Sequence, residues 1–335
     1  MTISDLDQKI KKNMLGSVYF FYGEETYLTE DKIKSVKKRL IPVGTEDLNF
    51  LQLEGKKADL NILEEFLDSF PQMSERKLAV VKNTGYFNNM NSTEFKRMKK
   101  MTENAAADTC LIFVEESFDK KKEKNLDFIA EKGGVVRFDF LPGNQAEVWL
   151  ERLFERCEKR VSDRDISYIV RQCGPALGSI YGEFSKLIHF VGQRQSVTRE
   201  DIDAVIVKST EAKIFELFDD IVESRRSKVM ENFKNLMDSG EKPLSVMSRL
   251  IGSVSELLMV KLLKEEGVSQ DEILGYFDFK RPAFVVNKLY TQSKKFGEAY
   301  LRRMIYKGLR YDVSVKSGKL DARAAAELYV VELLG

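Results

Sequence analysis

Residues 18–40 read VYFFYGEETYLTEDKIKSVKKRL and combine a buried-strand pattern, a single glycine and a charged helix. This order predicts the first strand, turn and helix of an α/β domain, at the place where a phosphate-binding loop would sit. Such a loop needs several glycines whose N–H groups wrap phosphates, followed by a lysine and a serine or threonine. Only Gly23 is present here, and Glu24 and Glu25 would repel a nucleotide. The stretch therefore predicts a nucleotide-binding frame without its phosphate-binding chemistry.

Apolar runs alternate with helical patterns through the first 140 residues, which is typical of a parallel sheet wrapped by helices. The runs predict five strands, at residues 18–22, 49–53, 77–81, 110–114 and 135–140. The intervals predict helices at residues 28–40, 59–70, 93–101 and 126–131. We therefore expect a five-stranded α/β domain over residues 1–140, of the kind that AAA+ ATPases use.

Strand patterns stop after Pro142 and Gly143, and apolar residues then recur at helical spacing. Thr198, with Asp201 three residues later, predicts the N-terminus of one of these helices. We place domain boundaries near residues 141 and 209. The sequence thus predicts a small helical domain over residues 141–208 and a second helical domain over residues 209–335.

The composition indicates a folded chain without a strong overall charge. The 335 residues are 43% hydrophobic, and 54 Lys and Arg nearly cancel 53 Asp and Glu, so nucleic acid would require a local basic patch. No run of about 18 apolar residues occurs, and we expect a cytoplasmic protein without a membrane span. The three widely separated cysteines, Cys110, Cys157 and Cys173, predict buried thiols in a reducing compartment.

The residues that would carry catalysis are missing from their expected places. A working ATPase of this fold needs a carboxylate pair after the third strand, but Lys82 and Asn83 follow it here. Glu115 and Glu116 end the fourth strand, where they could be metal ligands or, as we favour, a solvated strand end. The only histidine, His189, lies in an apolar helical stretch without a catalytic partner. We find no convincing active site, metal site or cofactor site.

Five segments together carry a family likeness. In chain order they are FYGEETYL (residues 21–28), FPQMSERKLAVVKN (70–83), FELFDDIVESR (215–225), GEKPLSVMSRL (240–250) and KSGKLDARAAAELYVVELL (316–334). In their order and spacing they resemble the delta subunits of bacterial DNA polymerase III, the clamp-opening subunits of the clamp loader. The resemblance extends over nearly the whole chain.

The resemblance implies a three-domain subunit. Residues 1–140 would be an AAA+-like domain that does not bind ATP, residues 141–208 a helical lid, and residues 209–335 a helical collar that joins a pentameric ring. Implied partners are the sliding clamp, the ATPase and delta-prime subunits of the loader, and primed DNA within the assembly. The chain would be a non-catalytic subunit of a DNA-directed DNA polymerase complex, without a cofactor.

The resemblance also assigns a clamp-binding segment, composed of Phe70, Pro71, Gln72 and Met73. In the family this tip offers two large apolar side chains to a pocket on the clamp. Those positions match Gln72 and Met73 here, so one is polar and the contact depends more on Met73 and Phe70. The alternative is that Phe70 and Met73 staple the helix end to the sheet.

One block of the chain is strongly basic. Residues 280–323 contain 12 basic and three acidic residues with tyrosines between them, which favours phosphate contact and base stacking. The alternative is a collar helix with a basic solvent face, whose aromatic residues face the core together with Leu301, Ile305 and Leu309. The predicted DNA contacts are Lys288, Lys294, Lys295, Arg302, Arg303, Lys307 and Arg310; Lys316, Gly318 and Glu327 match the family's collar pattern, in packing and capping roles.

Two other function classes remain open from the sequence. The chain could be a nucleotide-dependent AAA+ enzyme whose phosphate loop has diverged, which predicts magnesium-dependent ATP binding. It could also be a helical DNA-binding scaffold that acts without a clamp, which predicts DNA binding by the isolated chain.

Overall fold

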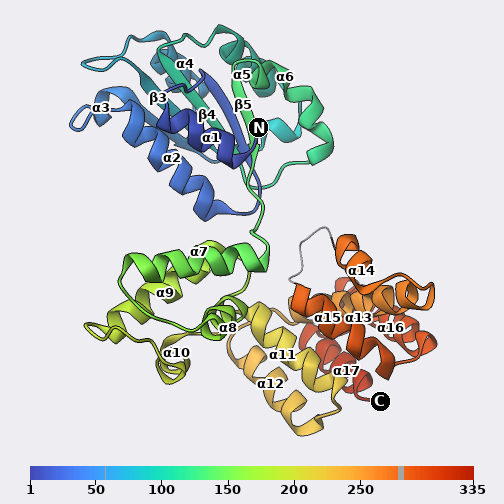
Figure 1. Ribbon diagram of the computed structural model, residues 1–335. Coiled ribbons are helices and arrows are strands. Elements are labelled where there is room, and N and C mark those ends of the chain that lie inside the picture. The colour runs from blue at the N-terminus through green and yellow to red at the C-terminus, as the bar shows by residue number, and fades with distance from the viewer. Residues whose placement is uncertain (57, 278–282) are drawn as a thin grey trace. The chain divides into compact units, whose positions relative to one another are not determined.

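The computed structural model describes residues 1–56, 58–277 and 283–335 (Figure 1). The chain forms two units, Met1–Phe140 and Leu141–Gly335, and each is considered by itself. The further division of the second unit near residue 209 stays a prediction.

The first unit is built on a five-stranded sheet with the order β2-β3-β4-β1-β5, in which every neighbouring pair is parallel. Its strands are β1 (Val18–Tyr22), β2 (Phe50–Glu54), β3 (Lys77–Lys82), β4 (Thr109–Glu115) and β5 (Gly133–Arg137). The AAA+-like α/β fold expected from the sequence is therefore confirmed. The fifth strand was predicted to start two residues and to end three residues too late, because β5 pairs only with β1 and ends where β1 ends, with Tyr22 opposite Arg137.

Alternating strand residues build two cores on opposite faces of this sheet. Phe20 and Phe113 pack beneath α4 to α6, whereas Phe21 and Ile112 pack beneath α1 and α2 (Figure 1). The helices of this unit are α1 (Ile3–Lys11), α2 (Thr26–Leu40), α3 (Glu46–Asn49), α4 (Leu60–Asp68), α5 (Thr93–Asn104) and α6 (Asp127–Ala130), with short 3₁₀ turns at Tyr86–Asn88 and Lys120–Leu126.

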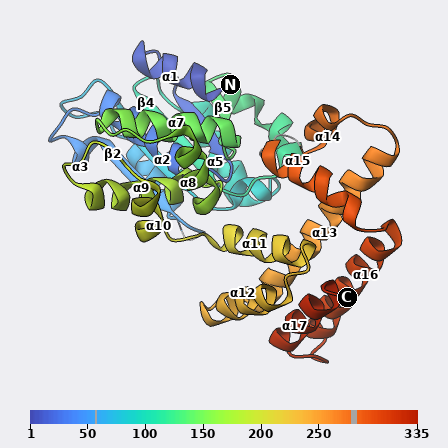
Figure 2. The same ribbon diagram turned by 60° about the horizontal axis from the view of Figure 1, so that its bottom comes forward.

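In its described residues the second unit forms helices, with one isolated β-bridge between Arg160 and Ser196. It contains α7 (Gly143–Arg156), α8 (Asp163–Cys173), α9 (Leu177–Val191), α10 (Arg199–Val205), α11 (Thr210–Val222), α12 (Arg226–Asp238), α13 (Pro243–Glu265), α14 (Gln270–Tyr276), α15 (Ala283–Gln292), α16 (Glu298–Lys316) and α17 (Ala322–Leu333), with a 3₁₀ turn at Ser293–Lys295. The long helix α13 lies at the centre of the C-terminal helices and packs on α16 and α17 (Figure 2). A Cβ atom at Gly308 would lie 2.5 Å from Ile251 Cγ1, so α16 approaches α13 closely. None of the helices in the described part of the chain is long and apolar enough to cross a bilayer.

Candidate functional site

The loop between α4 and β3, residues 69–76 and here called the tip loop, presents apolar side chains to solvent. The predicted helix over residues 59–70 ends early, at Asp68, and leaves Phe70 outside it. Phe70 is 82% exposed and Met73 is 86% exposed. Neither side chain packs against the sheet, so the staple interpretation is wrong for both residues.

A buried lysine ends α4 at the start of the tip loop. Lys77 is the first residue of β3, and its Nζ donates hydrogen bonds to the carbonyl oxygens of Phe66 (2.6 Å), Leu67 (2.9 Å) and Ser69. A helix leaves its last carbonyl groups without intrahelical donors, and a cation there also suits the helix dipole. Burial lowers the pKa of the Lys77 ammonium group. Lys77 thus fixes where the helix stops and the tip loop begins.

Asn49 holds the middle of the tip loop through its amide. Its Nδ2 donates to the carbonyl of Gln72 at 2.7 Å, and its Oδ1 accepts from the Gln72 N–H at 2.8 Å. The next residue, Met73, has φ of +54°, a left-handed conformation that side chains other than glycine rarely adopt. Strain of this kind persists only where neighbouring contacts impose it, and the paired bonds to Gln72 supply that constraint.

The base of the tip loop is fastened by Arg76. Its guanidinium donates to the carbonyl oxygens of Leu15 (2.8 Å), Gly16 (2.9 Å) and Thr109 (3.1 Å), next to the starts of β1 and β4. The tip loop is therefore held at its beginning, middle and end, and its exposed side chains extend from a rigid frame.

The turn after β1 lies at the opposite end of the sheet. Its sequence lacks the residues of a phosphate-binding loop. The Gly23 N–H donates to the Glu115 carbonyl at 3.2 Å, and the Glu25 N–H donates to the Phe138 carbonyl at 3.0 Å. A Cβ atom on Gly23 would lie 2.1 Å from the Phe138 oxygen. In a phosphate-binding loop, backbone N–H groups at these positions would face the phosphate. Here the Gly23 and Glu25 N–H groups donate to the Glu115 and Phe138 carbonyls instead.

The ends of β3 and β4 are joined in the same way. Asn83 donates through Nδ2 to the Glu116 carboxylate at 2.8 Å, and its Oδ1 accepts from the Glu116 N–H at 3.2 Å. Glu115 is buried and accepts from Thr84 Oγ1 and the Gly85 N–H, each at 2.9 Å. The interpretation of both glutamates as a solvated strand end is therefore wrong for Glu115, because its carboxylate closes a turn inside the protein.

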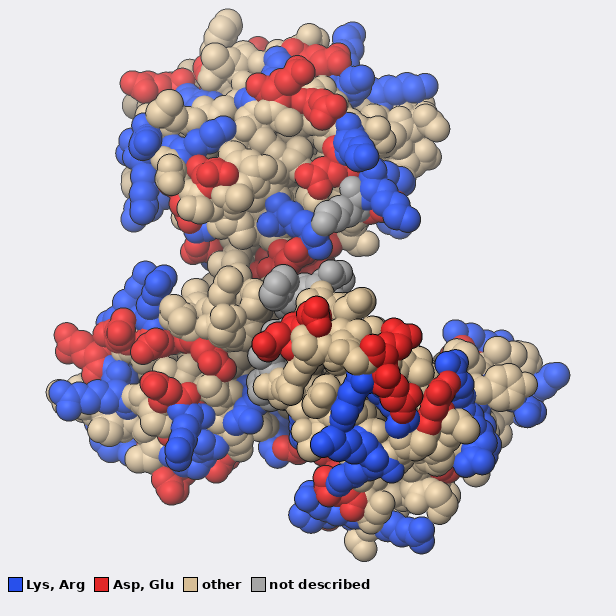
Figure 3. All heavy atoms as spheres, turned by 45° about the vertical axis from the view of Figure 1, so that its right-hand side comes forward, with Lys and Arg blue, Asp and Glu red and all other residues tan. Residues whose placement is uncertain are grey.

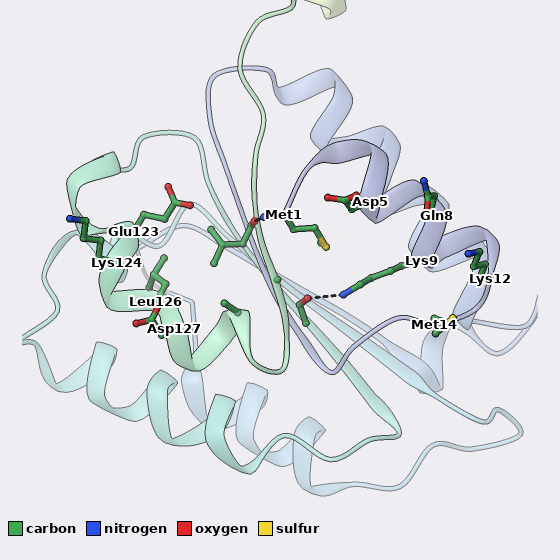
Figure 4. A pocket seen from close by; sticks show the side chains of 14 residues that line it. Met1, Asp5, Gln8, Lys9, Lys12, Met14, Glu123, Lys124, Leu126 and Asp127 are labelled. Atoms are coloured by element: carbon green, nitrogen blue, oxygen red, sulfur yellow. Dashed lines mark hydrogen bonds between the residues drawn. The ribbon is translucent and has the colours of Figure 1, made fainter.

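A pocket of about 920 Å³ opens at the free edge of β5, between α1 and the segment that contains α6 (Figure 4). The Lys9 ammonium donates to the Gly133 carbonyl at 3.0 Å, and the Met1 ammonium donates to the Val135 carbonyl at 3.1 Å. These bonds cover outward carbonyl groups of an edge strand. The sheet order places β5 at the edge opposite β2, so this pocket is separate from the tip loop.

Comparison with known proteins identifies the family. The sequence model for the DNA polymerase III delta subunit matches residues 19–139, and the model for the C-terminal domain of that subunit matches residues 211–333. Together the two models cover more than half of the chain. The chain belongs to the DNA polymerase III delta subunit family.

Two relatives extend the similarity over the full length. DNA polymerase III subunit delta of Bacillus subtilis (strain 168) is 25% identical over 339 aligned residues, which cover 99% of this chain and 97% of that protein. Among solved structures, the Bacillus subtilis DNA clamp loader delta protein covers 99% of both chains at 25% identity, with a TM-score of 0.60. The delta-family fold thus accounts for the whole chain.

The basic segment of this delta-family chain is largely neutralised by its own fold. Lys280 and Arg281 lie outside the described residues. Six of the other basic side chains form ion pairs within the second unit: Lys288 with Asp219, Lys295 with Glu223, Arg302 with Glu298, Lys307 with Glu332, Lys316 with Asp312 and Arg323 with Asp238. Figure 3 accordingly shows acidic and basic side chains interspersed over the visible surface. Lys294, Arg303 and Arg310 have no carboxylate partner among the described residues, and DNA contact stays a prediction that depends mainly on them.

The aromatic residues of this segment are divided between core and surface. Tyr290, Phe296, Tyr300 and Tyr311 pack against the C-terminal core, whereas Tyr306 is 63% exposed. Leu309 is also half exposed, so its predicted place in the core is wrong. The helix α16 directs Leu301, Met304 and Gly308 inward, and residue 309 lies outside that face.

The three residues of the family's collar pattern lie on or beside the last two helices. Lys316 pairs with Asp312 one turn earlier at 2.7 Å. Gly318 follows the end of α16 with φ of +72°; its N–H bonds to the Val315 carbonyl, and the Lys319 N–H bonds to the Ser314 carbonyl. This is a Schellman cap. Glu327 is exposed on α17.

The cysteines and the histidine do not form a reactive site. Burial raises the pKa of the Cys110 and Cys173 thiols to about 12. Cys157 is exposed at the end of α7, so the prediction of a third buried thiol is wrong. His189 Nδ1 lies 2.6 Å from the Ser185 carbonyl oxygen of its own helix. Among the residues that the structure describes, no three His, Cys, Asp or Glu side chains are grouped as metal ligands.

The residues that hold the tip loop were missed by sequence reasoning. Asn49 lies 23 positions before Gln72, and no local pattern connects them. Lys77 was read only as the first residue of a strand, although a lysine within an otherwise apolar run, KLAVV, was a usable signal for a buried polar contact. Arg76 joins the tip loop to segments 60 and 33 positions away, which only the topology brings together.

Proposed function

We propose that this chain is the clamp-loader subunit that binds and opens the sliding clamp so that it can be loaded on primed DNA. The observation that carries the proposal is the exposure of Phe70 and Met73 on a tip loop held by Lys77, Asn49 and Arg76. Large apolar side chains at a fixed loop tip have no core to fill in the isolated chain. Burial in a partner would stabilise the complex by about 1.5 to 3 kcal/mol for each side chain.

The proposed mechanism requires no nucleotide on this subunit. A ligand shifts a conformational equilibrium only by its differential affinity, so the tip loop opens the clamp by binding the open ring more tightly than the closed ring. The turn at Gly23 supports this assignment, because its N–H groups are used within the sheet. ATP bound by the ATPase subunits would control access to the tip loop.

The remaining partners follow from the relatives' roles. The two Bacillus subtilis matches are described as a DNA polymerase III subunit and as a DNA clamp loader protein, and we infer the same assembly for this chain. The first unit would meet the clamp, residues 141–208 would form the lid, and residues 209–335 the collar that contacts the ATPase and delta-prime subunits. The subunit would have no catalytic activity of its own.

Binding to the sliding clamp of the same organism tests the proposal. We expect Met73→Ser and Phe70→Ser each to weaken binding about tenfold or more, since each removes a buried apolar contact. Val207→Ser is the matched control, because Val207 is an exposed apolar residue of the other unit. Wild-type affinity in both tip variants would contradict the proposal.

Clamp opening and nucleotide binding require separate measurements. The wild-type chain should release clamps from nicked circular DNA without ATP, and Met73→Ser should release them more slowly. Magnesium-dependent ATP binding by the isolated chain would instead favour the diverged AAA+ enzyme. DNA binding by the isolated chain without any clamp complex would favour the DNA-binding scaffold.

A further inference from the structure

Exposed apolar side chains gather on two neighbouring loops of the first unit. Phe70 and Met73 lie on the tip loop, and Val43 and Leu48 lie on the segment of residues 41–49 that precedes β2, here called the entry loop. Val43 is 97% exposed and Leu48 is 51% exposed. Both loops emerge at the amino ends of adjacent strands, β2 and β3, on the same side of the unit (Figures 1 and 2). A cluster of this kind on a soluble domain marks an interaction surface.

Hydrogen bonds fasten the two loops to each other. The same Asn49 amide that pairs with Gln72 also donates to the Thr45 carbonyl within the entry loop at 3.1 Å. Ser74 Oγ in the tip loop lies 3.4 Å from the Leu40 carbonyl, just before the entry loop. The four apolar side chains are therefore presented by a single preorganised frame, which reduces the ordering cost of binding.

The conformation of the entry loop directs Val43 outward. The Thr45 N–H and Oγ1 both donate to the Pro42 carbonyl, at 3.1 and 2.9 Å, and Gly44 has φ of +86°. These features define a type II turn with Val43 at its second position. The Glu46 carboxylate accepts from the Gly44 N–H at 2.7 Å and holds the turn closed. Turns do not favour β-branched residues, so Val43 is not explained by the conformation of this turn.

The charge of the two loops indicates which kind of partner they would bind. Residues 41–49 and 69–76 contain three acidic side chains, Glu46, Asp47 and Glu75, and one basic side chain, Arg76, whose guanidinium is bonded to backbone carbonyl groups at the base of the tip loop. This surface would repel nucleic acid and anionic lipid, whose phosphates need cations. It fits a protein with an apolar depression and a neutral or basic rim.

We propose that the entry loop is a second half of the clamp-binding surface, in which Val43 and Leu48 are buried against the same sliding clamp as Phe70 and Met73. This inference depends on the proposed function, because it assumes that the tip loop binds the clamp. The tip loop supplies the larger side chains, and the entry loop widens the apolar contact beside them.

The test measures binding of the full-length chain to the sliding clamp of the same organism by surface plasmon resonance. Val43→Ser should weaken binding about tenfold, and Val43→Ser with Leu48→Ser should weaken it further. Val207→Ser is again the control. Circular dichroism should show unchanged folding, because the substituted side chains are exposed. Hydrogen exchange of the peptide at residues 41–49 should slow when the clamp is bound.

The outcomes separate the two proposals. If the tip variants lose binding while both entry-loop variants bind like the wild type, and the peptide gains no protection, the entry loop is not part of the interface and the proposed function stands. If the wild-type chain does not bind the clamp, both proposals are wrong. Weaker binding by the entry-loop variants, with protection of that peptide, supports the larger surface.

Discussion

The two ends of the same five-stranded sheet have opposite surfaces. At the carboxyl ends, Gly23, Asn83 and Glu115 use their hydrogen-bonding groups to join neighbouring strands and turns. At the amino ends, buried polar groups also fix the loops, but they leave Phe70 and Met73 exposed. One end is closed by hydrogen bonds within the unit, and the other presents apolar groups to solvent.

Under the proposed function, the working surface of this fold lies at the amino ends of the strands. In open parallel α/β sheets, ligands usually bind outside the carboxyl ends of the strands. Here the Gly23 and Glu25 N–H groups in the turn after β1 already donate to the Glu115 and Phe138 carbonyls. The amino end gains rigidity from Asn49, Arg76 and Lys77, which bind backbone carbonyl groups rather than a ligand.

The largest expected effect comes from a substitution that pushes apart the carboxyl ends of β1 and β5. Gly23→Ala places a Cβ atom 2.1 Å from the Phe138 oxygen, at a residue whose φ is +132°. The chain just after β1 or the chain just after β5 must therefore move. We expect the free energy of opening the sheet to fall by about 3 kcal/mol or more. Hydrogen exchange of the β1 and β5 amides measures this opening directly. Tryptophan fluorescence would not report on it, since the only tryptophan, Trp149, lies in the other unit.

Gly55→Ala is the matched control for that substitution. Gly55 also lies at the carboxyl end and has φ of +83°, but no atom lies within 4 Å of its Cβ position. Left-handed strain alone should cost about 1 to 2 kcal/mol. Equal losses in the two variants would show that the close approach of Phe138 does not hold this end of the sheet together.

Asn49→Ala tests the open end. It removes the bond to Thr45 and the pair of bonds to Gln72, and it leaves the N–H and carbonyl groups of Gln72 without these partly buried partners. Such a loss costs about 1 to 3 kcal/mol. The Gln72 amide should exchange faster, and clamp binding should weaken because the tip loop must then be ordered on binding. Asn235→Ala, at an exposed position of α12, provides the comparison. Unchanged exchange at Gln72 would mean that Asn49 does not hold the tip loop.

The sequence predicted the frame better than the ends of its elements. The five strands were readable, because buried parallel strands are continuous apolar runs. The end of α4 was placed two residues too late, because a lysine from the next strand ends that helix. The burial of Glu115 was also missed, since a strand-end carboxylate is ordinarily solvated and only the fold brings Thr84 and Gly85 to it.

The candidate surfaces were predictable to different degrees. Phe70 and Met73 were named from the resemblance, and their exposure agrees with a binding role that is still to be measured. The basic segment was read from charge along the chain, which cannot show that Asp219 and Glu223 neutralise it from another helix. Val43 was not singled out, because a lone valine beside a proline and a glycine carries no motif.

The smallest expected effect concerns the buried carboxylate at the closed end. Burial raises the pKa of Glu115 above its usual 4.5, although hydrogen bonds from Thr84 and Gly85 lower it in part. The folded state therefore holds this proton more tightly than the unfolded state does. Between pH 4.5 and the folded-state pKa, the free energy of unfolding should fall as the pH rises.

Glu115→Gln should remove that contribution, so the stability of the variant relative to the wild type should increase from pH 4.5 towards neutral pH. Any constant cost of burying the new amide cancels, because the comparison is made along the pH axis. Thr84→Val should do the reverse and raise the pKa of Glu115 further, since it deletes a bond that favours the carboxylate. Urea unfolding at several pH values, followed by circular dichroism, measures both. Parallel curves for all three proteins would show that the carboxyl end is closed by neutral hydrogen bonds alone, as the amino-end contact between Asn49 and Gln72 is.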